Sequence, residues 1–164
     1  TLARLLAEQL RKKFKTVTVI SQDRFFKFEG ETPECIDWTR LLKALRGHED
    51  PQVCVIVEGF LLFSNDRVAE ACDYKFFMRL SKKTCYERRR ATKRTGLAGE
   101  RFDRFFEQSI WSSHEQHGQY ADLPGVVCLD AEQPPDQVLS VALEVLARPS
   151  AAPPVAPADL QPSP

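Results

Sequence analysis

The sequence lacks an excess of charge of either sign. Lysine plus arginine and aspartate plus glutamate each number 23, so the chain as a whole generates no field that would recruit nucleic acid or an acidic membrane. It also lacks an apolar run of the roughly 18 residues that a membrane-spanning helix requires. We therefore expect neither nucleic-acid nor membrane partners. The length of 164 residues is that of one domain with a real core.

The cysteines and histidines form no metal or disulfide motif. The five cysteines are an odd number without a Cys-x-x-Cys pair, and two of them lie in apolar, strand-like runs. This pattern is typical of reduced core thiols in a cytoplasmic or nuclear protein. The histidines His48, His114 and His117 have no metal-ligand spacing with cysteine or acid, and we interpret them as surface residues.

Short apolar runs alternate with amphipathic segments along the chain. The patterns predict strands over 16–20, 53–60, 74–80 and 125–130, and helices over 2–13, 38–46, 66–72, 82–94, 101–117 and 135–147. This alternation is typical of an α/β fold with a parallel sheet covered on both faces. Proline accounts for six of the last sixteen residues. We therefore predict one domain over 1–148 and a disordered, Pro/Ala-rich tail over 149–164.

Three carboxylates lie at or just past the ends of predicted strands. They are Asp23, Glu58 and Asp130. Ligands of an open α/β sheet bind outside the carboxyl ends of its strands, so we expect these acids to gather at one edge. Each acid taken alone also has an ordinary explanation as a helix cap or loop residue. A carboxylate at that edge could accept a hydroxyl proton or hold Mg²⁺ through water.

Two further stretches each have a functional and an ordinary interpretation. The run "CYERRRATKR" (85–94) is either a solvated helix face or a phosphate-binding cluster on a movable lid, because arginine binds phosphate oxygens with a rigid fork and a Gly-containing segment follows. Asp37 precedes a predicted helix, where an N-cap acid is common. Its alternative role is to bind two hydroxyls of a sugar.

Several motifs together resemble the nicotinamide riboside kinases, which are small P-loop kinases related to the uridine-cytidine kinases. The motifs are "TLARLLAEQL", "VTVISQDRFFK", "VIVEGFLLF", "CYERRR" and "VVCLD". The resemblance extends from Thr1 to about Leu146, and the second and third motifs are the specific ones. It implies a P-loop NTPase-like, three-layer fold with a parallel sheet between two layers of helices.

The phosphate loop of that family is missing from the sequence. Nothing here matches G-x-x-x-x-G-K-[ST], and Thr1 resembles the residue just after the loop's lysine and Mg²⁺-binding threonine. The resemblance also implies that the strand before this loop, the central one of the sheet, is absent. We therefore expect an incomplete kinase that, as printed, binds Mg·ATP negligibly.

The resemblance assigns roles to the acids and to one basic residue. Asp23 matches the catalytic acid that accepts the proton of the riboside 5′-hydroxyl and helps to hold Mg²⁺. Glu58 matches a second acid near the metal. Asp37 matches the acid that binds the ribose 2′- and 3′-hydroxyls. Arg24, also in the substrate site, departs from the family's second aspartate and changes the local charge.

The resemblance also assigns the walls of a nucleoside pocket. Phe25 and Phe26 match positions that line it, and Phe26 is the expected stacking surface for a pyridinium ring. Ile36 replaces an aromatic residue of the family. That wall of the ring pocket is therefore weakened unless Trp38 substitutes for it.

The remaining assignments concern ATP. Arg88 and Arg89 match lid arginines that contact ATP and substrate, with Arg89 toward the substrate. The lid's next basic position corresponds to Thr92, Lys93 or Arg94, depending on one residue of slip in the match. Glu132 and Gln133 would lie at the edge of the adenine site.

Taken together, the resemblance implies ATP-dependent, Mg²⁺-assisted phosphorylation of nicotinamide riboside, or of nicotinic acid riboside, in NAD salvage. A uridine-cytidine type of kinase is the alternative within the enzyme class. A non-catalytic kinase remnant that acts as an interaction protein is the alternative outside it.

Overall fold

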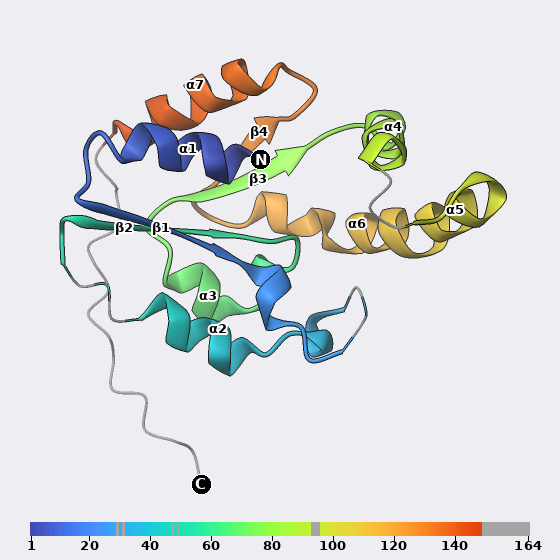
Figure 1. Ribbon diagram of the computed structural model, residues 1–164, viewed down its shortest axis with the longest axis horizontal. Helices are drawn as coiled ribbons and strands as arrows, with labels where there is room; N and C mark the ends of the chain where they lie inside the picture. Colours follow the sequence, from blue (N-terminus) through green and yellow to red (C-terminus); the bar gives the residue numbers. More distant parts are fainter. Residues whose placement is uncertain (29, 31, 47, 49, 93–95, 149–164) are drawn as a thin grey trace, which may run out of the picture.

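The apolar, β-branched runs form four short strands separated by helices (Figure 1). The computed structural model describes residues 1–28, 30, 32–46, 48, 50–92 and 96–148. The strands are β1 (Thr16–Ser21), β2 (Val53–Glu58), β3 (Lys75–Arg79) and β4 (Val126–Asp130). The helices are α1 (Leu2–Leu10), α2 (Trp38–Leu45), α3 (Asp66–Glu70), α4 (Lys82–Thr92), α5 (Gly99–Phe105), α6 (Ser112–His117) and α7 (Pro135–Leu146). The predicted α/β class is confirmed. The tail over 149–164 lies outside the described residues, so its disorder stays a prediction.

The strands pair in two separate parallel sheets. β1 pairs with β2 in a register that sets Ser21 beside Glu58, and β3 pairs with β4 in a register that sets Arg79 beside Asp130. Within the described residues each strand therefore has one edge without a partner strand. The single continuous sheet that the alternation predicted is not observed there. β2 is apolar up to Glu58, as a central strand would be, yet every one of its residues is only half-buried.

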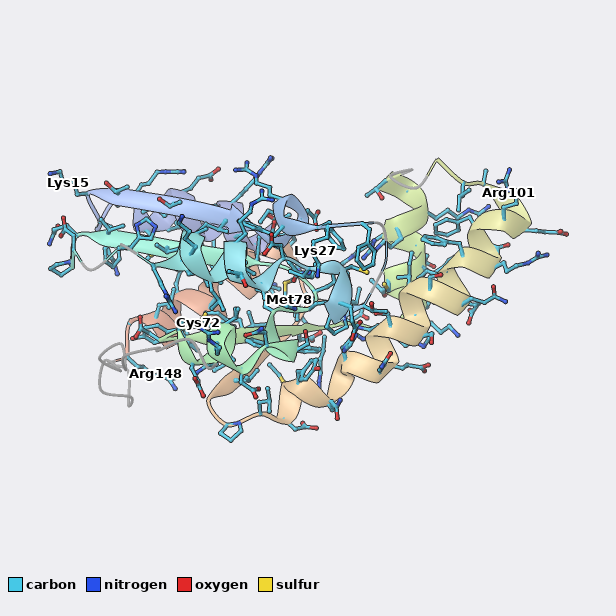
Figure 2. The ribbon with its side chains drawn as sticks, turned by 90° about the horizontal axis from the view of Figure 1, so that it is seen from below. Lys15, Lys27, Cys72, Met78, Arg101 and Arg148 are labelled. Carbon is cyan, nitrogen blue, oxygen red and sulfur yellow. The ribbon has the colours of Figure 1, made fainter. Side chains whose placement is uncertain are left out.

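Helices cover both faces of the strands. In Figure 1, α1 and α7 lie on one side, and α2 and α3 lie on the other. The helices α4, α5 and α6 form a separate arm, with Arg101 at its outer end and Lys15 and Arg148 at the opposite end of the molecule (Figure 2). In the described part of the chain, every helix is too short or too polar to cross a membrane.

The buried apolar side chains form three clusters. The first joins β1 to α2 and α3 and contains Ile20, Phe25, Ile36, Leu41, Leu42, Leu61 and Val68. The second lies under α1 and α7 and contains Leu6, Leu10, Leu129, Val138 and Ala142, with half-buried residues of all four strands packed against it. The third belongs to the arm and contains Phe102, Phe106 and Ile110. The second cluster is therefore the one that spans both sheets.

The predicted helix over 101–117 is interrupted. A π-helical segment, Phe106–Trp111, joins α5 to α6, and segments of this kind are rare. The wider turn changes which side chains face inward beyond it. His117, which we interpreted as a surface residue, is 7% exposed, and its ring stacks on Tyr120 at 5.5 Å between centroids. That interpretation was wrong for His117, and His114 is half-buried as well.

Candidate functional site

Two carboxylates lie at the carboxyl edge of the β1–β2 sheet. Glu58 is the last residue of β2 and is paired with Ser21, the last residue of β1. Asp23 follows two residues later, in the 3₁₀ helix Gln22–Phe25, where it is exposed. Parallel pairing therefore brings Asp23 and Glu58 to the same edge. Asp130 ends a strand of the other sheet, and its two carboxylate oxygens accept hydrogen bonds from Glu132 N (3.0 Å) and Gln133 Nε2 (3.0 Å).

The segment before α2 folds back against the turn that carries Asp23. The Asp37 N–H donates to the Phe25 carbonyl at 2.7 Å, and Phe26 forms an antiparallel bridge with Ile36. The Arg40 guanidinium adds a bond from Nη2 to the Arg24 carbonyl at 3.1 Å. These contacts connect Asp37 to the same edge, although it lies far from Glu58 in the sequence. The chain thus brings three of the predicted site acids into one region.

Asp37 also serves as the N-cap of α2. Its Oδ1 accepts a hydrogen bond from the Arg40 N–H at 3.0 Å. The ordinary interpretation of this residue is therefore confirmed. The cap uses one carboxylate oxygen, and the sugar-binding role of the residue stays a prediction.

The predicted pocket residues divide between core and surface. Phe25 and Ile36 are buried in the first cluster, so they support the site from within rather than presenting a free face. Trp38 packs against the same cluster, and its indole N–H donates to the Pro33 carbonyl at 2.9 Å. Phe26 is half-buried, and its ring contacts the ring of Phe60 in the turn after β2.

Phe60, which the sequence reasoning did not select, stacks on Phe26. The ring centroids are 6.4 Å apart and the rings are inclined by 22°. Phe60 follows Glu58 by two residues and is 40% exposed. The signal that could have found it is an aromatic residue directly after a strand-end "EG" turn.

A buried glutamine joins the two strand-end turns. The side chain of Gln22 is fully buried, and its Oε1 accepts a hydrogen bond from the Leu61 N–H at 3.0 Å. Gly59 lies so close that a Cβ at that position would come within 3.0 Å of three Gln22 side-chain atoms. The turn after β2 is therefore packed directly on the turn after β1.

The arginines of α4 differ in their surroundings. Arg88, Arg89 and Arg90 are all exposed. The Arg90 guanidinium lies 5.8 Å from the Tyr86 ring centroid, and its Nη1 donates to the Tyr86 hydroxyl at 3.2 Å. Lys93 and Arg94 lie outside the described residues.

Glu132 attaches the loop after β4 to the start of α4. Its carboxylate accepts from the Ser81 N–H at 2.5 Å and from the Thr84 hydroxyl at 2.7 Å. These bonds, with Arg88 as a weaker electrostatic contributor, lower the pKa of Glu132. The two predicted ATP residues Arg88 and Glu132 are thus brought together, and Glu132 already has two partners.

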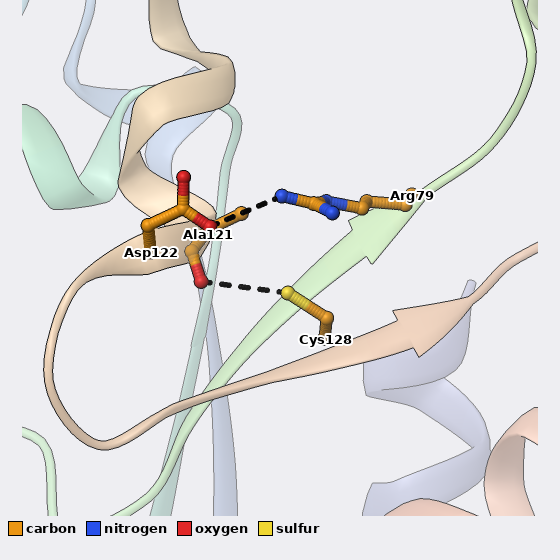
Figure 3. A network of polar contacts seen from close by, with 4 residues as sticks. All are labelled: Arg79, Ala121, Asp122 and Cys128. Atoms are coloured by element: carbon orange, nitrogen blue, oxygen red, sulfur yellow. Dashed lines mark hydrogen bonds and ion pairs between the residues drawn. The ribbon is translucent and has the colours of Figure 1, made fainter.

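A cavity of about 510 Å³ lies at the carboxyl ends of β3 and β4. Its lining includes Phe77, Arg79, Ser81, His114 and Glu132. Burial lowers the pKa of His114. Two contacts beside this cavity connect β3 and β4 to the segment 121–122 (Figure 3): Arg79 Nη2 lies 3.4 Å from Asp122 Oδ1, and Cys128 Sγ donates to the Ala121 carbonyl at 3.4 Å. The lining also includes Asp130, so the sequence reasoning found Asp130 and Glu132 but none of the other lining residues.

The acids at the β1–β2 edge supply carboxylate oxygens, and their binding of Mg²⁺ stays a prediction. Among residues 1–28, 30, 32–46, 48, 50–92 and 96–148, no group of three or more His, Cys, Asp or Glu side chains could hold a metal ion. Mg²⁺ is usually bound by one or two carboxylates together with substrate phosphates and water. The pair Asp23 and Glu58 fits that pattern.

We expect the capping role of Asp37 to be measurable apart from any ligand. Asp37→Ala removes the acceptor for the Arg40 N–H and should lower the free energy of unfolding by about 1 kcal/mol. Asp37→Asn keeps a capping oxygen and should stay within about 0.5 kcal/mol of the natural protein. Urea denaturation of both variants checks this. Equal losses in the two variants would contradict the capping role.

We also expect acid to loosen the start of α4 through Glu132. Because the pKa of this carboxyl is lower in the folded state than its ordinary value of 4.5, its contribution to stability is present above that value and is lost as the pH falls through the folded pKa. The protection of the Ser81 amide, measured as its exchange rate relative to the intrinsic rate at each pH, should therefore fall at acid pH. In Glu132→Ala, which lacks an acceptor, this protection should already be low at pH 7. An unchanged Ser81 exchange rate in this variant would contradict the contact.

Comparison with known proteins assigns no family to the chain. No protein-family model matches it, and no curated protein matches it. The function is therefore argued from the chain's own motifs and from the geometry of its strand ends.

Proposed function

We propose that this chain is the acceptor-binding and phosphoryl-transfer unit of a nucleoside kinase. In this proposal it transfers the γ-phosphoryl group of ATP to the 5′-hydroxyl of nicotinamide riboside, or of nicotinic acid riboside, to give the mononucleotide. The observation that supports it most is the parallel register of Ser21 with Glu58, because it brings Asp23 and Glu58 to one edge of a sheet. The substrate is proposed from the resemblance of the motifs around both acids to those of the nicotinamide riboside kinases.

The surroundings of these acids support a sugar-and-base acceptor. Asp37 is held near the same edge by its backbone bond to Phe25 and offers an oxygen to ribose hydroxyls in addition to its cap. Phe26 offers an aromatic face beside it. A carboxylate that pairs with adjacent hydroxyls and a ring that stacks on a base are the two recognition elements that a riboside requires.

Each acid has a defined role in the proposed reaction. The Asp23 carboxylate accepts a hydrogen bond from the 5′-hydroxyl and takes its proton as the O5′–Pγ bond forms, while the bond from Pγ to the β,γ-bridging oxygen breaks and ADP leaves. Asp23 and Glu58 would hold Mg²⁺, which neutralises phosphate charge when bound. Arg88 and Arg89 would contact the phosphates from α4.

The same proposal includes the fold class, a three-layer P-loop fold. Such a fold would require a further strand between β2 and β3. Both have one edge without a partner strand among the described residues. The half-buried state of β2, whose apolar sequence is typical of a central strand, supports this arrangement.

The proposal is tested by a kinase assay on the longest natural form of the protein that contains this sequence. With Mg·ATP as donor, we expect nicotinamide riboside to be phosphorylated with a higher kcat/KM than uridine or cytidine. Preference for a pyrimidine nucleoside would support the uridine-cytidine type of kinase instead. No product from any riboside would overturn the proposal and favour a non-catalytic protein.

We expect Asp23 and Asp37 to separate kinetically. Asp23→Ala should lower kcat by about 100-fold or more with little change in the riboside KM, because a base acts mainly in the transition state. Asp37→Asn, which keeps the helix cap, should act mostly on KM and on discrimination against deoxyribosides. Steady-state kinetics with the riboside and with its deoxyriboside analogue checks this. The reverse pattern of effects on kcat and KM would contradict the two roles.

We expect the arginines of α4 to be unequal. Arg88→Gln or Arg89→Gln should cost at least about 2 kcal/mol in kcat/KM, because a lost phosphate contact in the transition state typically costs that much. Arg90→Gln is the matched control in the same helix. Arg90 is already engaged with Tyr86, so its replacement should stay within about 0.5 kcal/mol. Small and equal effects of all three substitutions on kcat/KM would favour the interpretation of α4 as a solvated helix face.

A further inference from the structure

The buried side-chain amide of Gln22 makes a hydrogen bond through its oxygen but not through its nitrogen. Its Oε1 accepts from the Leu61 N–H, whereas its Nε2 is buried and has no hydrogen-bond partner among the described residues. The orientation of the amide is fixed, because only an oxygen can accept a bond from an N–H. Keeping an amide nitrogen buried without a partner costs stability. Gln22 therefore occupies this buried place at a desolvation cost of its own.

The same side chain determines the path of the turn after β2. Gly59 leaves room for Gln22, since a Cβ at residue 59 would approach the Oε1, Cβ and Cδ atoms of Gln22 within 3.0 Å. Cβ cannot rotate away as a side-chain end can, so any larger residue would move the backbone. The Leu61 N–H is held from the other side of the turn. Phe60 lies between these two fixed points.

This arrangement keeps Phe60 exposed at the edge while its ring meets Phe26. Leu61, the next residue, is fully buried and anchors the turn in the first core cluster. A large aromatic side chain that is 40% exposed gains little from the core, but it provides a face for a planar ligand. The acids Asp23 and Glu58 belong to the same strand ends. A flat ring with positive charge gains from both features, since aromatic faces and carboxylates each attract a cation.

We propose that Gln22 is a positioning residue that holds Phe60 against Phe26, and that this ring pair selects the cationic, planar base of the riboside. The inference rests on the proposed function. It adds to that function a residue that determines base specificity, Phe60, and a residue that acts through it, Gln22. Phe60 contacts the base, and Gln22 contacts only the turn.

Calorimetric titration with nicotinamide riboside and with uridine tests the ring pair. Phe60→Leu removes the aromatic face but keeps an apolar side chain, and it should weaken binding of nicotinamide riboside about tenfold with a smaller effect on uridine. Phe60→Tyr keeps the ring and should stay within about twofold. Phe28→Leu is the matched control, because Phe28 is 56% exposed in the loop after β1 and lies outside the ring pair. It should also stay within about twofold.

A double-mutant cycle tests Gln22. Gln22→Met removes the acceptor for Leu61 and should weaken binding about tenfold. In the double variant with Phe60→Leu, the loss should not exceed that of Phe60→Leu alone by more than about twofold, because both changes remove the same ring contact. If Gln22→Met does not fold by circular dichroism, Gly59→Ala replaces it. Its Cβ would come within 3.0 Å of Gln22 and shift the turn that carries Phe60, so it should also weaken binding about tenfold.

The outcomes separate this inference from the function on which it rests. No binding of nicotinamide riboside by the natural protein would overturn both. Binding that Phe60→Leu leaves unchanged would overturn the ring pair alone. Additive losses in the double variant, or unchanged binding in the folded single variant at the Gln22 contact, would overturn the positioning role of Gln22.

Discussion

The layer formed by α1 and α7 is the constraint on which the rest of the structure depends. The two parallel sheets share no strand pairing among the described residues, so the apolar cluster under these helices joins them. Half-buried side chains of all four strands reach this cluster, and it contains the buried residues Leu129 and Ala142. Burial of apolar area is non-directional, which permits two sheets to be aligned without hydrogen bonds between them. The position of the β1–β2 edge relative to the β3–β4 edge therefore depends on this packing.

Parallel strand pairing and the local turns position different parts of the candidate site. Pairing in register decides that Asp23 and Glu58 share an edge, whereas the turns decide what lies around them. Two contacts restrain the backbone of these turns. One is the hydrogen bond from Asp37 N to the Phe25 carbonyl, and the other is the contact of the Gln22 side chain with the turn at Gly59. The acids are therefore positioned by the sheet, and the aromatic faces are positioned by the loops.

Much of the fold and part of the site could be predicted from the sequence. The α/β class, the order of the elements and the positions of Asp23 and Glu58 follow from short-range patterns, because parallel strands align their carboxyl ends. The split into two sheets does not follow from the apolar runs, which do not specify which strands pair; it was the resemblance that implied a missing central strand. Phe60 and Gln22 were missed because their roles depend on a contact between residues 39 positions apart in the chain. His117 was misplaced because the absence of metal-ligand spacing says nothing about burial, and its ring is buried against Tyr120 by the fold.

The self-contained aromatic core of the arm has a mechanical consequence. Phe102, Phe106 and Ile110 pack with residues of the arm itself, including Cys85, Tyr86 and Trp111. Rotation of α4 to α6 as one rigid lever would therefore expose little of this apolar surface. The arm is held to the strands by the polar contacts of Glu132 with Ser81 and Thr84 at the base of α4, and by the stacking of His114 in α6 on Phe77 in β3. A rotation of the arm would have to break these few contacts, which costs less than opening a core.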